Sequence, residues 1–387
     1  MDKRYIIFLS FLLGVFLFVC SLEGVKNALK LVSHEWLSLL LSMIQRRVAP
    51  LTGLALGILS TSLVQSSSAV IAATMVSMAG LVASGLPLSS AVSFGIPMVL
   101  GANIGTTITN TIVAVGVKRG MTVKEFNATV PGVIIDDIFK YLNVGLFFTL
   151  EVTTGFLSGT ILKLAGFLVG AFQLETFFAM FEKSVVDIFI TGPIINPISE
   201  IFSEFLGIGT GGIILFVSWF LGIIFALSLL EKSLNALIEL PQFEKRVLAA
   251  FKSPFRSFAT GVGITFIVGS SSIGTSLIVP FLATSMINLE NAYPYILGCA
   301  IGTTVDLSQI YGYIAGGVIG MTLGLVHMLF NVFGVIIWWL LPLKVVPLKV
   351  ARGIGGFITS HRQSHLLLLG FVALIYFIIP LSIIFLL

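Results

Sequence analysis

Charged residues are scarce in this 387-residue sequence, where Asp, Glu, Lys and Arg together make up 10% of the chain. A soluble globular protein carries roughly 25%. Together with 57% apolar residues and a mean hydropathy of +1.10, this scarcity excludes a soluble domain, a disordered chain and a DNA-binding module. The 21 Lys and Arg residues against 17 Asp and Glu residues indicate cytoplasmic loops of a membrane protein rather than a nucleic-acid partner.

Cysteine and histidine are also few. The two cysteines, Cys20 and Cys299, both lie in apolar stretches, which argues against a disulfide framework. Four scattered histidines make no metal site. From Leu51 to Val117 the chain has no Asp, Glu, Lys, Arg or His, so this part offers no general acid or base. Because the central motifs also lack a nucleophile–base pair, we do not expect an enzyme.

Long apolar runs predict an all-α polytopic membrane protein of about ten membrane-embedded segments, at about 20 residues per span. The runs expected to cross the bilayer as helices are 5–22, 87–117, 129–150, 159–190, 205–230, 292–320, 321–341 and 366–387. We expect the longer runs to contain breaks. The basic residues Lys3 and Arg4 favour a first transmembrane helix with a cytoplasmic N-terminus. A cleaved signal with an acylated Cys20 is the alternative, although the residues before Cys20 are not small.

Two other apolar stretches are too short to cross. Leu51–Val64 and Ser257–Val268 hold 14 and 12 residues, whereas the hydrocarbon core is about 30 Å thick and needs about 20. Each is followed by a serine cluster and then another short apolar run. This order predicts a re-entrant helical hairpin, whose tip backbone must face protein or a water-filled cavity.

An internal repeat organises the chain. Residues 61–68 read T-S-L-V-Q-S-S-S and residues 265–272 read T-F-I-V-G-S-S-S, while 101–107 read G-A-N-I-G-T-T and 298–304 read G-C-A-I-G-T-T. Two ordered motifs at nearly one spacing predict two inverted repeats, each with a re-entrant hairpin and a broken transmembrane helix. Many secondary transporters are built from such repeats, with the substrate between them.

The repeat divides the chain into five parts. We expect an N-terminal transmembrane helix and connector at 1–50, a first transport repeat at 51–190 and a linking helix with a polar connector at 191–256. A second transport repeat follows at 257–353 and a C-terminal transmembrane helix at 354–387.

The serine clusters suggest anion binding. Serine hydroxyls at a helix break are joined by the free N–H groups of the next helix, whose N-terminus carries about half a positive charge. Such sites bind oxyanions without a basic side chain. Two facing clusters could therefore surround a tetrahedral oxyanion, with metal cations rather than basic residues balancing its charge. Close helix packing by small residues is the alternative.

The glycine motifs suggest cation binding. Their glycines permit an unwound turn, and the exposed carbonyls, threonine hydroxyls and the Asn103 amide oxygen are ligands suited to Na+. A tight helix crossing is the alternative. Asp306 lies within an apolar run, where a carboxylate is costly and usually functional. It is a Na+ ligand, a protonatable group or a loop residue at the membrane edge.

Other polar residues have simpler explanations. Asp136 and Lys140 are four residues apart, which favours local pairing on one helix. His327 and Asn331 share one helical face, and we expect a structural interhelical hydrogen bond there rather than catalysis.

The ordered motifs resemble the type II sodium-dependent phosphate cotransporters. The likeness includes G-A-N-I-G-T-T-I-T-N-T-I-V-A (101–114), D-x-F-x-Y-L-N…L-E-V-T-T-G (137–155), T-F-I-V-x-S-S-S-I-x-T-S (265–276), L-E-N-A-Y-P (289–294), H-M-L-F-N (327–331) and K-V-A-R-G (349–353). The resemblance implies a multi-pass plasma (inner) membrane transporter that couples Na+ movement to uptake of inorganic phosphate by alternating access. The implied partners are phosphate, sodium ions and the lipid bilayer, with Na+ as coupling ion, no other cofactor, and self-association into a homo-oligomer left open.

The resemblance also implies site residues. The phosphate residues would be Gln65, Ser66, Ser67, Ser68, Ser270, Ser271 and Ser272. The sodium residues would be Asn103, Thr106, Thr107, Thr303 and Thr304. This chain departs from the family at Gly269, where a Gln is usual, and at Ala300, where an Asn is usual. Because two oxygen ligands are thereby missing, we expect Asp306 to compensate as a sodium ligand.

Two other classes of function stay open. An anion channel would use the same pair of hairpins without a coupling ion. A non-transporting membrane subunit would scaffold a signalling complex. Phosphate accumulation driven by Na+ in liposomes separates both from a transporter.

Overall fold

The computed structural model describes residues 3–31, 49–117, 123–171, 190, 192–238, 251, 253–268, 270–283, 287–305, 307–361 and 364–386. Within these ranges every regular element is a helix and no strand occurs, as the apolar pattern predicts. The α-helices are α1 (Lys3–Leu31), α3 (Ala49–Val64), α4 (Ser67–Ala83), α5 (Leu88–Gly105), α6 (Ile108–Val117), α7 (Val123–Thr154), α8 (Phe156–Ala171), α10 (Asn196–Leu206), α11 (Ile208–Ile238), α13 (Pro254–Val268), α14 (Ser271–Ser276), α15 (Val279–Ala283), α16 (Leu289–Gly302), α17 (Leu307–Val335), α18 (Val345–Thr359), α19 (Ser364–Ala373) and α20 (Ile379–Leu386).

Several helices are long and apolar enough to cross a bilayer. Four described segments meet that test: Ile6–Val25, Leu88–Ile112, Gln309–Leu340 and Ser364–Leu386. A fifth span is possible if the pair Thr129–Thr154 and Phe156–Ala171, bent by 84°, counts as one. These helices confirm the fold class of an all-α multi-pass membrane protein.

The predicted breaks are partly wrong in position. We expected two spans to meet at residues 320 and 321, but this point lies inside α17. The structure instead interrupts the chain with a 3-10 turn at Thr303–Val305 and with non-helical backbone at Gly317, whose φ is 54°. The region after Ala171, which the prediction continued as helix to residue 190, lies largely outside the described residues.

The first serine cluster forms the tip of a pair of short helices. Helices α3 and α4 have 16 and 17 residues, or about 24 and 26 Å at 1.5 Å per residue. Between them Gln65 adopts a left-handed φ of 62°, which is uncommon for a residue other than glycine. The Ser66 side chain then caps α4 by accepting a hydrogen bond from the Ala69 N–H at 3.4 Å. The predicted helix break therefore lies at the serine cluster.

The second serine cluster follows a similar short helix. Helix α13 has 15 residues and ends at Val268. The chain resumes in the six-residue α14 and the five-residue α15, so this return limb is shorter than α4 and interrupted. We call residues 49–171 the first half and 253–340 the second half. Their inverted orientation in a bilayer remains a prediction.

Glycine motifs mark a close helix crossing in each half. A Cβ on Gly57 would collide with the Met98 carbonyl oxygen, and one on Gly101 would collide with that of Leu54. Gly261 and Gly298 stand in the same relation to the carbonyl oxygens of Tyr295 and Phe258. Helix α3 thus crosses α5, and α13 crosses α16, backbone against backbone.

This arrangement corrects one expectation. Residues 101–105 and 298–302 lie inside α5 and α16 rather than in an unwound turn. The α-helix ends directly afterwards, in a turn at residues 106–107 and in a 3-10 turn at Thr303–Val305. The glycines serve the tight crossing, because a helix keeps its hydrogen bonds while a missing Cβ lets two backbones approach.

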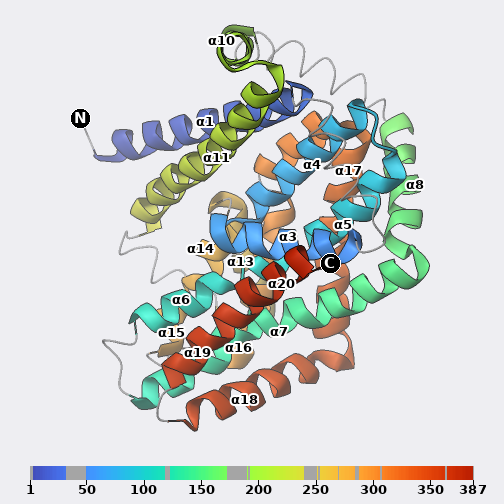
Figure 1. The fold of residues 1–387 in the computed structure, drawn as a ribbon. Helices are drawn as coiled ribbons and strands as arrows, with labels where there is room; N and C mark the ends of the chain where they lie inside the picture. The colour runs from blue at the N-terminus through green and yellow to red at the C-terminus, as the bar shows by residue number, and fades with distance from the viewer. Residues whose placement is uncertain are drawn as a thin grey trace.

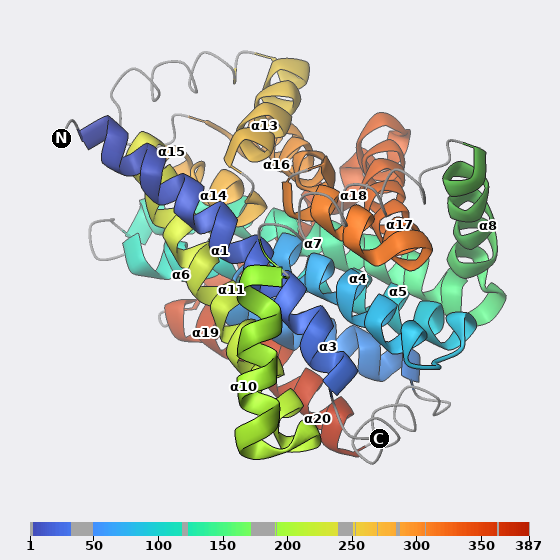
Figure 2. The same ribbon diagram turned by 90° about the horizontal axis from the view of Figure 1, so that it is seen from above.

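The remaining helices surround these crossings. Helices α1 and α11 run side by side along one edge of the molecule (Figures 1 and 2). Helix α7 passes beneath the crossings and turns into α8 at Gly155, whose φ is 63°. The Glu151 carboxylate stabilises that bend by accepting the N–H groups of Leu157 and Ser158 at 2.8 and 3.0 Å. Helix α18 packs on α7 and forms an ion pair to α16 between Arg352 and Glu290.

Candidate functional site

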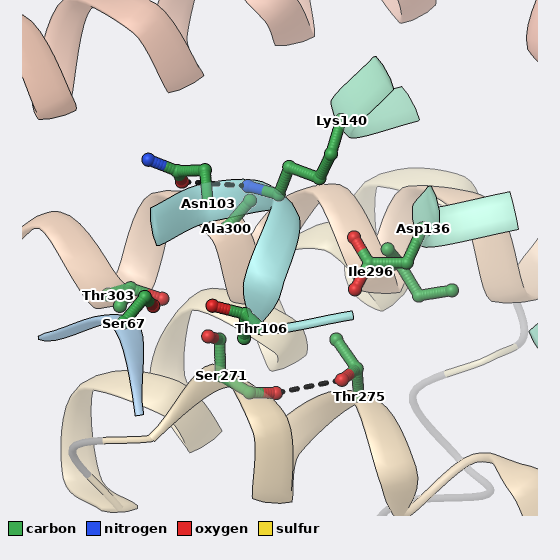
Figure 3. Close-up of a pocket in the computed structure, with 10 residues that line it drawn as sticks. All are labelled: Ser67, Asn103, Thr106, Asp136, Lys140, Ser271, Thr275, Ile296, Ala300 and Thr303. Atoms are coloured by element: carbon green, nitrogen blue, oxygen red, sulfur yellow. Dashed lines mark hydrogen bonds between the residues drawn. The ribbon is translucent and has the colours of Figure 1, made fainter. Parts of the chain in front are cut away.

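A polar pocket lies where the two halves meet (Figure 3). Its lining residues come from α4, α5 and α7 and from the loop after α5 in the first half, and from α14, α16 and the turn after α16 in the second. They are Ser67, Asn103, Thr106, Asp136, Lys140, Ser271, Thr275, Ile296, Ala300 and Thr303. Each half thus contributes five of these ten residues, so the pocket forms only where the two halves pack together.

The two serine tips come together as predicted. Ser67 and Ser271 line the same pocket, although 204 positions separate them in the sequence. The Ser272 hydroxyl donates to the Gln65 carbonyl oxygen at 3.2 Å. This contact joins the first tip, Gln65–Ser68, directly to the second tip, Ser270–Ser272.

The other predicted phosphate residues have structural roles near the tips. The Gln65 side chain accepts from Thr109 Oγ1 at 2.9 Å and donates to the Ser62 carbonyl at 2.9 Å. The Ser68 carbonyl accepts from Gln309 Nε2 at 2.9 Å. Ser66 caps α4, and Ser270 stands half-buried before α14. Ser67 and Ser271 are therefore the members of the two clusters that face the pocket.

The paired threonines repeat one geometry in both halves. Thr106 and Thr303 line the pocket and donate to the carbonyls of Ala102 and Cys299 at 3.0 and 2.8 Å. Thr304 donates to the Ile301 carbonyl oxygen at 2.8 Å, and the Thr107 hydroxyl lies 2.9 Å from the corresponding carbonyl oxygen of Ile104. A hydroxyl that donates its proton keeps two lone pairs, so these oxygens can still accept a hydrogen bond or coordinate a cation.

Asn103 and Lys140 meet at the same pocket. The Asn103 Oδ1 atom accepts from Lys140 Nζ at 3.2 Å, the bond drawn in Figure 3, and from Asn331 Nδ2 at 3.4 Å. Lys140 also donates to Asn331 Oδ1 at 2.8 Å. The interhelical hydrogen bond expected of Asn331 is therefore confirmed.

The expectation of a site without a basic side chain is wrong. Lys140 is only 5% exposed and lines the pocket. No basic residue lies close to the motifs along the chain, but α7, a later part of the sequence, packs against α5 and α16 and brings Lys140 to the pocket. The local pairing expected between Lys140 and Asp136 also gives way to other partners. Lys140 donates to the two asparagines, and the Asp136 carboxylate accepts from Asn110 Nδ2 at 3.3 Å.

A second buried carboxylate, Asp137, was missed as a site residue. Its Oδ1 atom accepts from Thr107 Oγ1 at 2.5 Å and from the Tyr376 hydroxyl, which itself accepts from the Tyr141 hydroxyl at 3.0 Å. Among the described residues its Oδ2 atom is buried and has no hydrogen-bond partner. The signal was present in the sequence, because an intramembrane carboxylate is by default a functional candidate.

Five further residues need separate mention. Asp306 and Gly269 lie outside the described residues, so the role expected of Asp306 stays a prediction. The hydroxyls of Thr61 and Thr265 stand at matching positions of the two halves and both are buried, and in the described structure that of Thr61 has no hydrogen-bond partner. His327 Nδ1 lies 3.3 Å from Gln309 Oε1, a contact within α17 across the Gly317 break.

An apolar helical bundle that encloses a polar pocket between two similar halves defines a multi-pass membrane protein with a buried polar site. The chain belongs to the Na+/Pi-cotransporter family, which matches residues 17–135 and 223–373, more than half of its length. The resemblance drawn from the motifs is thereby confirmed.

Curated relatives agree with the family. The sodium-dependent phosphate transport protein 2A of Rattus norvegicus is 29% identical over 420 residues, covering 92% of this chain and 64% of the relative. The sodium-dependent phosphate transport protein 2B of Homo sapiens is 28% identical over 464 residues, covering 98% and 64%. The chain therefore spans about 64% of the length of these relatives. No solved structure matches it significantly.

Proposed function

We propose that this protein couples inward Na+ movement to uptake of inorganic phosphate across the plasma membrane. The family and the names of the relatives support this reaction. The observation that carries it is the meeting of Ser67 and Ser271 in one buried pocket. Two hydroxyl-bearing tips at the interface between two halves suit a ligand site that must open to one side of the membrane and then to the other.

Phosphate is held between the two tips. Ser67 and Ser271 offer hydroxyl donors, and α4 begins at Ser67, so its first N–H groups have no partner within the helix. A tetrahedral oxyanion accepts such donors, and the helix N-terminus favours its negative charge. Thr275 lines the same pocket and donates to Asn110 Oδ1 at 2.8 Å, which fixes the wall opposite the first tip.

Sodium is held by oxygen atoms beside the pocket. Hydroxyl and carboxylate oxygens are hard ligands, and Asp137 Oδ2 is a buried anionic oxygen without a protein partner in the described residues. Thr107 and Tyr376 place their oxygens against the same carboxylate. We therefore add Asp137 to the sodium ligands expected from the sequence, Asn103, Thr106, Thr107, Thr303, Thr304 and Asp306.

Transport proceeds by alternating access. Sodium binding lowers the electrostatic free energy of an anion in the pocket. Phosphate then binds between the two serine tips and holds them together. A lift-like movement of the two hairpins against the surrounding helices is favoured, because each short hairpin helix packs tightly on its own partner, α3 on α5 and α13 on α16. Each net positive charge carried inward gains roughly 2.3 kcal/mol per 100 mV.

Radiolabelled phosphate uptake into proteoliposomes tests the proposal. With equal inwardly directed gradients of Na+, Li+ or K+ at two pH values, we expect phosphate to accumulate above the external concentration with Na+ only. A channel would equilibrate phosphate without accumulating it, and a scaffold protein would show no uptake. Either result would remove the proposed function.

A further inference from the structure

The Lys140 side chain sits in a cage built for a cation. Its ammonium donates to Asn103 Oδ1 at 3.2 Å and to Asn331 Oδ1 at 2.8 Å. It lies 5.2 and 5.9 Å from the ring centroids of Phe139 and Phe330, and aromatic faces attract cations at such distances. Both halves supply one asparagine oxygen and one ring.

The same pattern occurs in both halves with different charges. Asp136, Phe139 and Lys140 in α7 match His327, Phe330 and Asn331 in α17 at a shift of 191 residues. Where the first half has a charged pair, the second has a neutral one. Lys140 meets its own matching residue, Asn331, so it lies where the two patterns converge.

An ammonium and a sodium ion compete for the same surroundings. Both carry one positive charge and both bind amide oxygens such as those of Asn103 and Asn331. An ammonium has three N–H donors, and the described residues supply acceptors for two of them. Because Lys140 also lines the pocket, the third donor is available to an anion between the tips.

We propose that the Lys140 ammonium is a tethered cation that occupies, between Asn103 and Asn331, a position which a coupling Na+ would otherwise take. It gives its charge to the phosphate held between the serine tips. The proposal rests on the Na+-coupled phosphate uptake proposed above. It removes Asn103 from the ligands of the transported sodium and lowers the number of Na+ ions per phosphate by one.

Asp136 completes the arrangement. It and Lys140 are the charged residues among those that line the pocket, 3% and 5% exposed. Their charges cancel, so the empty pocket carries no net side-chain charge. Removing the lysine charge alone leaves Asp136 uncompensated, which favours a sodium ion at the vacated position.

The number of Na+ ions per phosphate tests the proposal. In proteoliposomes at zero membrane potential and fixed pH, the final phosphate ratio equals the Na+ ratio raised to that number. With a tenfold Na+ gradient, we expect Lys140→Gln to accumulate about ten times more phosphate than the unmodified protein. This factor corresponds to about 1.4 kcal/mol of additional driving force. An unchanged ratio would overturn the proposal, whatever happens to phosphate affinity.

A binding measurement covers variants that do not transport. Na+ that binds the folded state raises the melting temperature, and the rise per tenfold Na+ increases with the number of ions bound. In detergent without phosphate, with choline keeping the ionic strength constant, we expect a steeper rise for Lys140→Gln than for the unmodified protein. An equal rise would overturn the proposal.

Two further variants complete the design. Lys163→Gln removes an exposed lysine from α8 and should leave both readouts unchanged. If Lys140→Gln does not fold, Lys140→Asn, which repeats the matching residue Asn331 and keeps Asp136, takes its place, and a Na+-dependent rise in its melting temperature no steeper than that of the unmodified protein would overturn the proposal. Failure of the unmodified protein to accumulate phosphate with Na+ would instead end the proposed function, while the melting experiment would still test Lys140.

Discussion

Replacing Gly101 by alanine should destabilise the first half. The new Cβ would collide with the carbonyl oxygen of Leu54, a backbone atom of α3 that cannot rotate away. Alanine itself favours a helix by about 1 kcal/mol over glycine, while overpacking costs typically 1–3 kcal/mol. Because the new Cβ is fixed to its own main chain and meets a main-chain oxygen, neither atom can move aside. We therefore expect the upper end of that range and a net loss of about 1–2 kcal/mol of folding stability. Phosphate affinity should fall too, since α3 leads directly into the serine tip.

The measurements are the melting temperature of purified protein and equilibrium phosphate binding. Gly145→Ala in α7 is the matched control, because nothing lies within 4 Å of its added Cβ, and it should be neutral or slightly stabilising. Gly298→Ala should cause a similar loss of stability in the second half, because its new Cβ would collide with the carbonyl oxygen of Phe258. If Gly101→Ala melted at or above the temperature of Gly145→Ala, the backbone-on-backbone crossing would be refuted.

Three other substitutions address the pocket and its ions. Ser67→Ala should weaken phosphate binding about fivefold, because it removes one hydrogen bond worth about 1 kcal/mol. Ser89→Ala, which changes an exposed serine at the start of α5, should leave phosphate binding unchanged. Equal phosphate affinities of the two variants in an equilibrium binding assay would favour a packing role for Ser67. Asp137→Asn should raise the Na+ concentration for half-maximal uptake about tenfold or more and change phosphate affinity at saturating Na+ less, and an unaltered Na+ dependence would exclude it as a ligand. Asp306→Asn should also weaken Na+ activation, and loss of pH dependence with intact Na+ dependence would mark a proton site instead.

The sequence was informative wherever length or local order sets the structure. Largely apolar stretches of 14 and 12 residues before a serine cluster predicted short helices that end there, and α3 and α13 end at Val64 and Val268. Their meeting followed from the repeat, since matching elements of two similar halves pack at a common interface. The fold class followed from the scarcity of charge together with the long apolar runs.

Tertiary contacts account for what the sequence left out. The glycines were compatible with an unwound turn or a close crossing, and only the position of α3 against α5 decides between them. Lys140 was paired with Asp136 by spacing alone, because nothing local shows that α7 delivers it to Asn103 of another helix. Asp137 needed Tyr376, 239 positions later, to complete its surroundings.

The two kinds of helix contact differ in stiffness. Where α3 meets α5 and α13 meets α16, the main chains of the two helices are in direct contact, so a change of side-chain rotamer cannot loosen the packing. Between the halves, by contrast, the contacts include side-chain hydrogen bonds such as that of the Ser272 hydroxyl to the Gln65 carbonyl, and a change of rotamer breaks each of them. Thermal motion should therefore open the molecule along the line between the serines and leave each crossing intact, so that water reaches the anion from one side without loosening the helices that hold it.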